Sequence, residues 1–395
     1  MARLLSIDEA RAKVLEAVAP LGTERVPVDD ALGRVLAEDV VAEHDVPPFD
    51  NSAMDGFALA AGPAGRTLTL VGESRAGTPA DRAPGEGEAI RVSTGAAVPP
   101  GTEAVVPGEQ TTSDDATVTV TSEVRPGQHL RAAGEDVRKG ATVLRRGTTL
   151  GPAELGIAVV AGRAQIEVAR RPRVALLITG DELKDAGEPL GPGEIHESNG
   201  TTLGALARQA GAAVVSRARV GDTREATEQA VKAGLGADVL ILSGGVSVGP
   251  HDHVKPALTA NGVEEVFWRV ALRPGKPTWF GRTDDTLVFG LPGNPVSAMV
   301  TFLLFVRPAL AKLQGGDAAA RRVRAVLGEA VERNPGRDEA VRVALREGEG
   351  GRVATPTGPQ GSHQLSSMLN ADGLALVTAG EGAAEEGEAV EIELI

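Results

Sequence analysis

The chain has 395 residues, which at roughly 100 to 200 residues per domain gives two to four domains and excludes a single small module. Apolar residues make up 42% of it and cysteine is absent, so it can bury cores but has no disulfides, thiolate metal sites or thiol nucleophiles. Its 40 basic and 54 acidic residues give a net charge of −14, the wrong sign for a protein that coats nucleic acid or anionic membranes.

The N-terminus and the apolar runs predict a cytoplasmic protein. The opening MARLLSIDEARAK reaches Asp8 and Glu9 before any apolar run long enough for a signal peptide. The longest apolar stretch, Ser297 to Val306, is far shorter than the ~20 residues of a membrane helix. We therefore expect a cytoplasmic location, with no membrane partner and no nucleic-acid partner.

The N-terminal part of the sequence predicts helices on either side of a β-rich insertion. Ser6 and Glu9 form an S-x-x-E capping box before an amphipathic helix, and a second helix is expected from Asp29. Between residues 43 and 136 the pattern changes to short strand-like runs separated by Gly and Pro. Gly151-Pro152 then predicts the start of another helix.

From Arg173 onward, strands and helices alternate, which is typical of a mostly parallel sheet covered by helices on both faces. After about Gly316 the sequence consists of strand-like runs around PTGPQGSHQLSSM, which suits a small β-barrel. The expected domains are a helical domain (1–42 plus 137–172), a β-rich insertion (43–136), an α/β domain (173–315) and a β-barrel (316–395).

The segment PPFDNSAMDGF, residues 47–57, contains two carboxylates, several turn formers and two of the nine aromatic residues of the chain. Such a density of chemistry in eleven positions is unusual for a generic loop. The alternative stays open that Asp50 and Ser52 cap helices and that Asp55-Gly56 is a turn.

Three loops in the α/β region each follow an apolar strand and are rich in small residues. They are TGDE (179–182), SGGVSVG (243–249) and GLPGNP (290–295). Small residues let backbone amides approach an anion, and ligands of open α/β sheets bind beyond the carboxyl ends of the strands. The three loops together predict an anion site, although each alone could be a tight turn with a helix cap, as Asn294-Pro295 illustrates.

Standard nucleotide-binding fingerprints are missing from these loops. Gly244 and Gly249 have the spacing of a P-loop, but Pro250-His251 replaces the Lys-Ser/Thr pair, and no G-x-G-x-x-G opens a helix. A kinase-like or ordinary NAD-binding protein is therefore disfavoured. We interpret His251-Asp252-His253 as a solvated helix start and not as a metal triplet.

Basic residues gather next to these loops in an otherwise acidic chain. Arg269, Arg273 and Lys276 lie close together, and Pro274-Gly275 predicts a turn between the last two. Clustered cations beside loops that suit phosphate predict an oxyanion site. An exposed turn balanced by nearby acids is the alternative.

Seven motifs occur in one order across nearly the whole chain: PPFDNSAMDGFA, RVSTGAAVPPGTEAVV, LRAAGEDVRKGATVL, LLITGDEL, ILSGGVSVGPHDHVK, VALRPGKPTWFG and GLPGNPVSA. Together they closely resemble the molybdopterin molybdenumtransferase family, which catalyses the last step of molybdenum cofactor synthesis and is related to the E domain of gephyrin. The resemblance implies a helical dimerisation domain with a β-rich insertion, a molybdopterin-binding α/β domain and a C-terminal β-barrel.

The resemblance also implies a reaction. Adenylylated molybdopterin would be the substrate, and its pyrophosphate would be hydrolysed while molybdate enters the dithiolene and AMP leaves. A divalent metal would assist, and oxygen ligands in a cysteine-free site suit Mg²⁺. The family further implies a homodimer whose site straddles two subunits, and transient contacts with the adenylyltransferase and with recipient apoenzymes.

The family's functional positions fall on residues of three kinds. The implied catalytic acids are Asp55, Asp136, Glu182 and Asp252, of which Asp55, Glu182 and Asp252 would bind the metal. The implied substrate-binding residues are Thr94, Gly180, Asp222, Ser243, Gly244, Gly245, Ser247, Gly249, Lys276, Pro292, Gly293, Asn294 and Pro295. The implied molybdate-binding residues are Arg273, Lys276, Ser297, Arg337 and Ser366.

Asp222 has an alternative structural explanation, and Arg273 departs from the residue common in the family. Asp222 in VGDTREA is also a plain helix cap. The family commonly has lysine where Arg273 stands, and arginine offers a planar fork in place of a point ammonium.

Two other functions are weighed against this one. The molybdopterin adenylyltransferase shares the α/β domain but lacks the first 170 residues and the barrel. A gephyrin-like scaffold would need a linked partner domain, and the sequence contains neither a linker nor such a domain.

Overall fold

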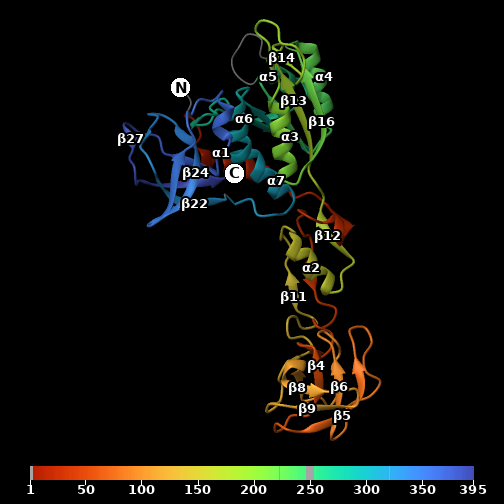
Figure 1. Cartoon of the computed structure of the whole chain (residues 1–395). Coiled ribbons are helices and arrows are strands. Elements are labelled where there is room, and N and C mark those ends of the chain that lie inside the picture. The colour runs from red at the N-terminus through yellow and green to blue at the C-terminus, as the bar shows by residue number, and fades with distance from the viewer. Residues whose placement is uncertain (1–2, 222, 246–252, 320) are drawn as a thin grey trace. The chain divides into compact units, whose positions relative to one another are not determined.

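The computed structural model describes residues 3–221, 223–245, 253–319 and 321–395. The chain forms two compact units (Figure 1). We call Met1–Glu24, Gly33–Val35 and Ala169–Ile395 the α/β–barrel unit, and Arg25–Leu32 with Leu36–Val168 the insertion unit.

A mixed six-stranded sheet organises the α/β part of the first unit. Its strands, in spatial order, are β16 (Ala213–Val220), β13 (Arg173–Thr179), β17 (Val239–Ser243), β21 (Leu287–Leu291), β20 (Trp279–Arg282) and β18 (Glu264–Trp268). The first four strands are parallel, whereas β20 runs antiparallel to both of its neighbours. The carboxyl ends of β13, β17, β21 and β18 therefore lie at one edge of the sheet.

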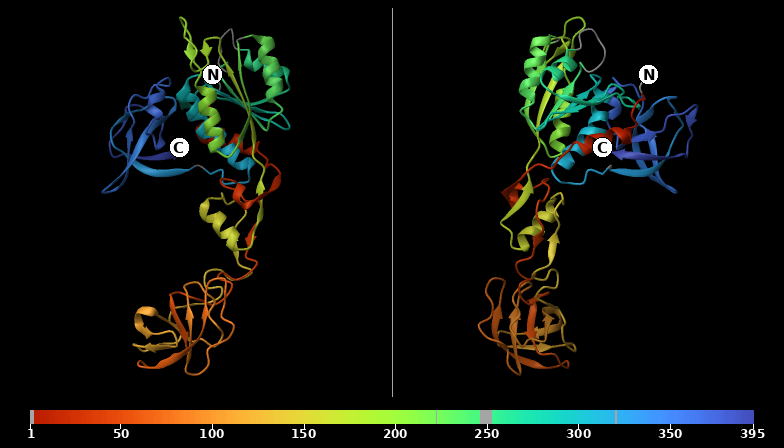
Figure 2. Two further views of the ribbon diagram at one scale, coloured as in Figure 1. Left: turned by 45° about the vertical axis from the view of Figure 1, so that its right-hand side comes forward. Right: turned by 180° about the vertical axis from the view of Figure 1, so that it is seen from behind.

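Helices cover both faces of this sheet (Figure 2). One face packs against α1 (Ile7–Glu16), α3 (Asn199–Gln209), α6 (Pro295–Thr301), a π-helical turn (Phe302–Val306) and α7 (Arg307–Leu313); the other packs against α4 (Arg224–Gly234) and α5 (Val254–Ala260). Alternate residues of β13 serve the two cores, since Val174 and Leu176 face the first and Ala175 and Leu177 the second. This explains the continuous apolar run of the strand.

The helical run Pro295–Leu313 is longer than the apolar stretch seen in the sequence. It has 19 residues and a mean hydropathy of 1.6, so by length and composition alone it is the one helix in the described ranges that could cross a membrane. However, 78% of its apolar window is buried inside the structure. The run is therefore a core helix of the unit, and it packs against α1 and α3.

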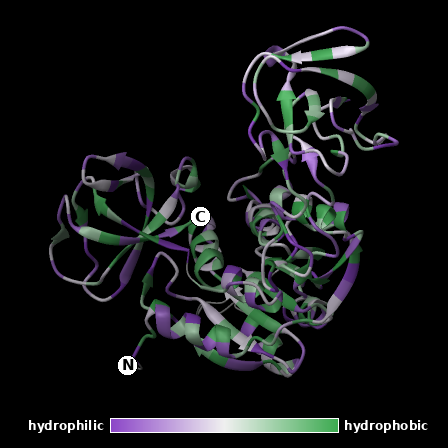
Figure 3. Ribbon diagram, turned by 90° about the horizontal axis from the view of Figure 1, so that it is seen from below, coloured by the Kyte–Doolittle hydropathy of each residue, from purple (hydrophilic) through white to green (hydrophobic). Residues whose placement is uncertain are grey.

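The C-terminal part of this unit is a closed five-stranded barrel. Its strands are β22 (Arg322–Leu327), β24 (Asp338–Gly348), β25 (Gly351–Pro356), β26 (Gly373–Val377) and β28 (Ala389–Leu394). The circle runs β24-β25-β22-β28-β26 and returns to β24. Along these strands apolar residues that fill the barrel alternate with polar ones (Figure 3).

Shorter elements complete the α/β–barrel unit. Strand β19 (Leu272–Arg273) leaves the α/β part and pairs in parallel with the start of β24. Its other short elements are β14 (Leu183–Lys184), β15 (Ile195–His196), β23 (Val331–Glu332), the 3-10 turn Leu365–Met368 and β27 (Ala383–Ala384). Because β19 pairs with β24, the loop that carries Arg273 is joined directly to the barrel.

The insertion unit contains a second six-stranded sheet, which agrees with the β-rich character predicted for this part of the sequence. Its order is β7 (Ala104–Pro107), β4 (Gly56–Leu59), β6 (Glu88–Val92), β5 (Thr67–Ser74), β9 (Thr117–Val120) and β8 (Thr111–Ser113). Its other elements are the 3-10 turns Val28–Asp30 and Gly108–Gln110, β2 (Val40–Val41), β3 (Asn51–Ser52), β10 (Leu130–Arg131), β11 (Thr142–Leu144) and α2 (Pro152–Val160), while β1 (Thr23–Pro27) and β12 (Gln165–Ala169) extend into the first unit.

The expected helical domain of residues 1–42 and 137–172 is not confirmed. Helix α1 does have the predicted capping box, in which the Glu9 backbone N–H donates to Ser6 Oγ over 3.1 Å, but it packs in the α/β core. The helix expected from Asp29 is a single 3-10 turn, because Pro27 precedes it and Gly33 turns the chain away with a φ of 72°. Helices α1 and α2 both form as predicted, but of the two only α2 lies in the insertion unit.

Candidate active site

The three glycine-containing loops predicted from the sequence begin side by side at the carboxyl edge of the α/β sheet. In the register of the parallel strands, Ile178, Ser243 and Leu291 are neighbours across β13, β17 and β21. The residues that follow them therefore leave the sheet side by side. The sequence prediction that the three loops converge is confirmed, and this edge is the one where open α/β sheets bind ligands.

Asn199 holds two of these loops together from the start of α3. Its side-chain Nδ2 donates to Ser243 Oγ over 2.9 Å and to the Gly293 carbonyl over 2.7 Å. Ser243 Oγ in turn donates to the Pro292 carbonyl over 3.3 Å. Asn199 is 8% exposed, and its Oδ1 has no hydrogen-bond partner among the described residues. This orphaned acceptor is a polar group available to the site.

The loop after β17 needs glycine because it touches the loop after β13. Gly244 and Gly245 have φ values of 93° and 62°, in the left-handed region. A Cβ at Gly244 would lie 2.7 Å from the Thr179 carbonyl oxygen, and one at Gly245 would lie 2.6 Å from Val254. A Cβ at Gly293 would lie 3.7 Å from the Gly244 Cα, so the three loops come together at glycines whose backbone groups no side chain covers.

Of the candidate acids in the α/β–barrel unit, only some lie within the described residues. Glu182 is exposed and its carboxylate lies over Gly180, where a Cβ would come within 2.6 Å of Oε2. The other predicted residues of this region, Asp222, Ser247, Gly249 and Asp252, lie outside the described residues.

Asn294 does not cap α6 with its side chain, contrary to the alternative drawn from the sequence. Its Nδ2 donates instead to Ser362 Oγ of the barrel over 2.9 Å, and the Val296 backbone N–H donates to the Ser362 carbonyl over 3.2 Å. Pro295 does occupy the first helical turn. Ser362 of the barrel therefore contacts the start of α6.

The predicted oxyanion residues lie on the same side of the unit. Arg273 Nη1 forms an ion pair with Glu339 Oε1 of β24 over 2.7 Å and stays 57% exposed, while Lys276 is also exposed. Ser297, in α6, is buried. Within the described chain, the side chains of Arg337 and Ser366 make no hydrogen bond to the α/β loops, and the serine that does so is Ser362.

Arg342 of β24 is a buried cation that the sequence analysis did not single out. It is 1% exposed, its Nε donates to Ser367 Oγ over 3.1 Å, and its Nη2 donates to the Gly361 carbonyl over 3.3 Å. Burial lowers the pKa of Arg342 to about 10, against a smaller opposing effect of Glu339. No carboxylate of the described residues forms an ion pair with it.

In the insertion unit, two predicted residues that are 39 positions apart come together. Asp55 Oδ1 accepts hydrogen bonds from the Thr94 backbone N–H over 2.7 Å and from Thr94 Oγ1 over 3.2 Å. Asp55 precedes β4, where Gly56 is required because a Cβ would lie 2.0 Å from the Val106 carbonyl oxygen. Asp136 is exposed, and no described contact joins it to Asp55.

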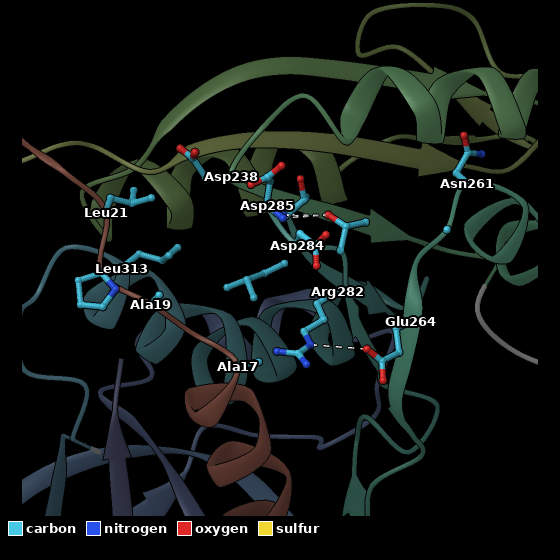
Figure 4. A pocket seen from close by; sticks show the side chains of 15 residues that line it. Ala17, Ala19, Leu21, Asp238, Asn261, Glu264, Arg282, Asp284, Asp285 and Leu313 are labelled. Atoms are coloured by element: carbon cyan, nitrogen blue, oxygen red, sulfur yellow. Dashed lines mark hydrogen bonds and ion pairs between the residues drawn. The ribbon is translucent and has the colours of Figure 1, made fainter.

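A separate cavity of about 590 Å³ lies at the opposite, amino edge of the α/β sheet. Figure 4 shows Asp238, Asp284, Asp285 and Glu264 around Arg282 in this cavity. Asp238 immediately precedes β17 and already accepts the Arg173 backbone N–H over 2.7 Å. Acidic groups at the wrong edge of the sheet do not suit an anionic ligand, so we place the candidate site at the carboxyl edge.

Comparisons with known proteins identify the family to which the chain belongs. Residues 5–162 match the MoeA N-terminal region (domain I and II), residues 175–312 match a probable molybdopterin binding domain, and residues 324–395 match the MoeA C-terminal region (domain IV). A Haemophilus influenzae protein named molybdopterin molybdenumtransferase is 37% identical over 398 residues, which cover 99% of this chain and 98% of that protein. The chain belongs to the molybdopterin molybdenumtransferase (MoeA) family.

Further members of the MoeA family support the same assignment. A Mycobacterium tuberculosis protein named molybdopterin molybdenumtransferase 2 is 39% identical over 387 residues, covering 93% of this chain and 94% of that protein. The crystal structure of the molybdopterin biosynthesis MoeA protein from Pyrococcus horikoshii OT3 matches with a TM-score of 0.83, 31% identity and full coverage of both chains. The fold and the order of its regions are thus those of the MoeA family.

The sequence analysis did not identify three residues in or beside this candidate site: Asn199, Arg342 and Ser362. Arg342 carried a signal, because a charged residue inside the apolar strand EAVRVAL must find a special environment. The sequence signal for Asn199 was weaker: the residue begins a helix that follows a strand ending at the binding edge. Ser362 carried none, because its segment has three serines and no periodicity.

Proposed function

We propose that the chain is a molybdopterin molybdenumtransferase that inserts molybdate into the dithiolene of adenylylated molybdopterin, with hydrolysis of the pyrophosphate and release of AMP. The observation that carries this proposal is the 37% identity to a molybdopterin molybdenumtransferase over nearly the full length of both chains. In the hydrolytic step, water adds to one phosphorus, the bridging P–O bond breaks, and AMP leaves with that oxygen or with the water oxygen.

The chain's own residues suit the parts of this reaction. Backbone groups of the glycine-lined loops, held by Asn199, would bind phosphate oxygens of the substrate. Arg273 and Lys276, together with Ser297 of α6, would bind molybdate, because the two cations follow the sheet edge that bears these loops in a chain of net charge −14. Arg337 and Ser366 remain the predicted contributions of the barrel.

Mg²⁺ is the metal that these side chains would hold best. Within the residues described, no three His, Asp or Glu side chains form a ready cluster, but Mg²⁺ is commonly held by one or two carboxylates together with substrate phosphates. Asp55, Glu182 and Asp252 are the candidate ligands. When bound, the ion would neutralise the pyrophosphate and stabilise the leaving group.

The proposal includes a homodimer, a cytoplasmic location, and transient contact with the adenylyltransferase and with recipient apoenzymes. A dimer would let Asp55 and Thr94 of one subunit serve the sheet edge of another. This arrangement is supported by their position in an insertion unit that contains acids but none of the three glycine-lined loops.

The decisive experiment measures AMP release from adenylylated molybdopterin with and without molybdate. A molybdenumtransferase releases AMP in a molybdate-dependent manner and yields molybdenum cofactor that activates an apoenzyme. An adenylyltransferase would instead consume ATP and accumulate the adenylylated compound, and a pure scaffold would do neither.

A further inference from the structure

The insertion unit contains a cavity of about 560 Å³ beside Asp55. The residues that line it are Asp55, Gly56, Phe57, Arg91, Val92, Ser93, Gly108, Glu109 and Ser113. Thr94, which holds Asp55, directly follows this lining in the sequence. The cavity thus adjoins the predicted functional residues of the unit.

Arg91 is held in the cavity by its neighbour across the sheet. It is paired with Phe57 between the antiparallel strands β6 and β4, and its guanidinium carbon lies 5.4 Å from the centre of the Phe57 ring. Phe57 is only 4% exposed, so the ring is fixed in the core and gives Arg91 a rigid surface to stack on. Arg91 itself is exposed.

The charges around this cavity single out Arg91. Among the lining residues, all of them described, it is the only basic one, and it faces two acids, Asp55 and Glu109. Asp55 Oδ1 accepts two hydrogen bonds from Thr94, and Arg91 forms no ion pair or side-chain hydrogen bond with any described residue. Its planar group of N–H donors is therefore available to a ligand.

We propose that Arg91 is a substrate-binding residue that contacts a phosphate group of adenylylated molybdopterin in the cavity beside Asp55. The inference rests on the proposed function, because the substrate is a polyanion that two carboxylates alone would repel. A guanidinium matches phosphate with two parallel hydrogen bonds, and stacking on Phe57 fixes its direction in advance.

The test compares Arg91→Ala and Arg91→Lys with Arg125→Ala, an exposed arginine of the same unit that does not line the cavity. Two readouts are taken on the full-length protein: the KM for adenylylated molybdopterin, and equilibrium binding of AMP, pyrophosphate and molybdate by calorimetry. We expect Arg91→Ala to raise the KM and weaken binding of AMP or pyrophosphate by about tenfold or more, as loss of a charged hydrogen bond does. Lysine should restore part of the affinity, and Arg125→Ala should behave as wild type.

The two phosphate-containing probes tell which part of the substrate Arg91 contacts. A loss confined to AMP places it on the adenylate, and a loss of both places it on the diphosphate. Unchanged binding of both in Arg91→Ala, or a loss of molybdate binding alone, would overturn the inference even if the wild type releases AMP normally. If the wild type released no AMP but bound it through Arg91, the proposed function would fail and the phosphate site would stand.

Discussion

The side-chain amide of Asn199 donates a hydrogen bond to Ser243 Oγ over 2.9 Å, joining the start of α3 to the end of β17. The same amide donates to the Gly293 carbonyl, so one side chain fixes the spacing of two loops at the binding edge. The geometry of a phosphate site made from backbone groups depends on such spacing, because backbone amides cannot adjust by changing rotamer.

We expect substitutions of Asn199 to impair substrate binding in a graded way. Asn199→Ala removes two donated hydrogen bonds, and Asn199→Asp replaces the donor by an acceptor that faces the Gly293 carbonyl, so the aspartate should be worse. Each should lower kcat/KM for adenylylated molybdopterin, with a loss of about 1 to 3 kcal/mol in the alanine variant. The control is Asn261→Ala, at the opposite edge of the sheet. If Asn261→Ala lowered kcat/KM as much as Asn199→Ala does, the role given to Asn199 would be contradicted.

Gly244→Ala should damage the site far more than its size suggests. The new Cβ would lie 2.7 Å from the Thr179 carbonyl at a φ of 93°, so the loop must move. We expect kcat/KM to fall steeply in steady-state assays of AMP release. The control is Gly156→Ala in α2, where no atom lies within 4 Å and the backbone is helical. Gly156→Ala should raise the free energy of unfolding by about 0.5 to 1 kcal/mol. Full activity in Gly244→Ala would contradict the argument that the loops approach too closely for a Cβ.

A composite active site predicts recovery of activity when two inactive variants are mixed. If Asp55 and Glu182 act from different subunits of a dimer, a heterodimer of Asp55→Asn and Glu182→Gln has one intact and one doubly altered site. Equal mixing with free exchange should restore about one quarter of the wild-type rate, since half the dimers have one working site. The rate of AMP release after subunit exchange decides the matter, with each variant alone as the control; no recovery means that the two acids act within one chain.

Much of the fold could be read from the sequence because its signals are local. The apolar runs of β13, β17 and β21 alternate with helical segments, which indicates a buried parallel sheet, and parallel strands end at one edge. The convergence of the glycine-rich loops follows from that rule. The capping box of α1 was likewise visible in Ser6 and Glu9, because both hydrogen bonds are made within one turn.

The parts that could not be predicted depend on contacts distant in sequence. The pairing of Asp55 with Thr94 requires the register of β4 against β6, which no local pattern specifies. The contact of Ser362 with Asn294 requires the placement of the barrel on α6. The missing helix at Asp29 shows the reverse case, in which a good start signal was overruled by Gly33 four residues later.

Neutralising Arg273 and Lys276 together should weaken the response to molybdate. We expect Arg273→Gln with Lys276→Gln to raise the molybdate concentration for half-maximal AMP release about tenfold or more, because each lost charged hydrogen bond costs ~1.5 to 3 kcal/mol. The KM for adenylylated molybdopterin should change little. A variant that loses this substrate but responds normally to molybdate would place the two side chains on the phosphate.

The ion pair with Glu339 calls for a further control in this experiment. Removing Arg273 leaves the Glu339 carboxylate, 12% exposed, without its partner, and this charge would itself repel an oxyanion. Arg273→Gln combined with Glu339→Gln removes both charges. The part of the molybdate effect that persists in this pair is the direct contribution of Arg273.

The buried guanidinium of Arg342, in the barrel next to the candidate site, should lower the free energy of unfolding of the chain. Burial disfavours the cation and lowers the pKa of Arg342 to about 10, so the folded state binds this proton less tightly than the unfolded state. The resulting destabilisation is fully present below about pH 10 and diminishes as the pH rises above 10 toward the ordinary pKa of arginine. Arg342→Met should therefore raise the unfolding free energy at pH 7.5 by about 1 kcal/mol.

Chemical denaturation at several pH values tests this prediction for Arg342. The advantage of the methionine variant over wild type should shrink above pH 10. The lysines also titrate in that range, but they are common to both proteins, so their effect cancels in the difference between the two. Arg346→Met, an exposed position on the same strand, should stay within about 0.5 kcal/mol of wild type at every pH. If Arg342→Met were instead less stable than wild type at pH 7.5, its hydrogen bonds to Ser367 and Gly361 would outweigh the cost of burying the charge, and the residue would be a structural anchor.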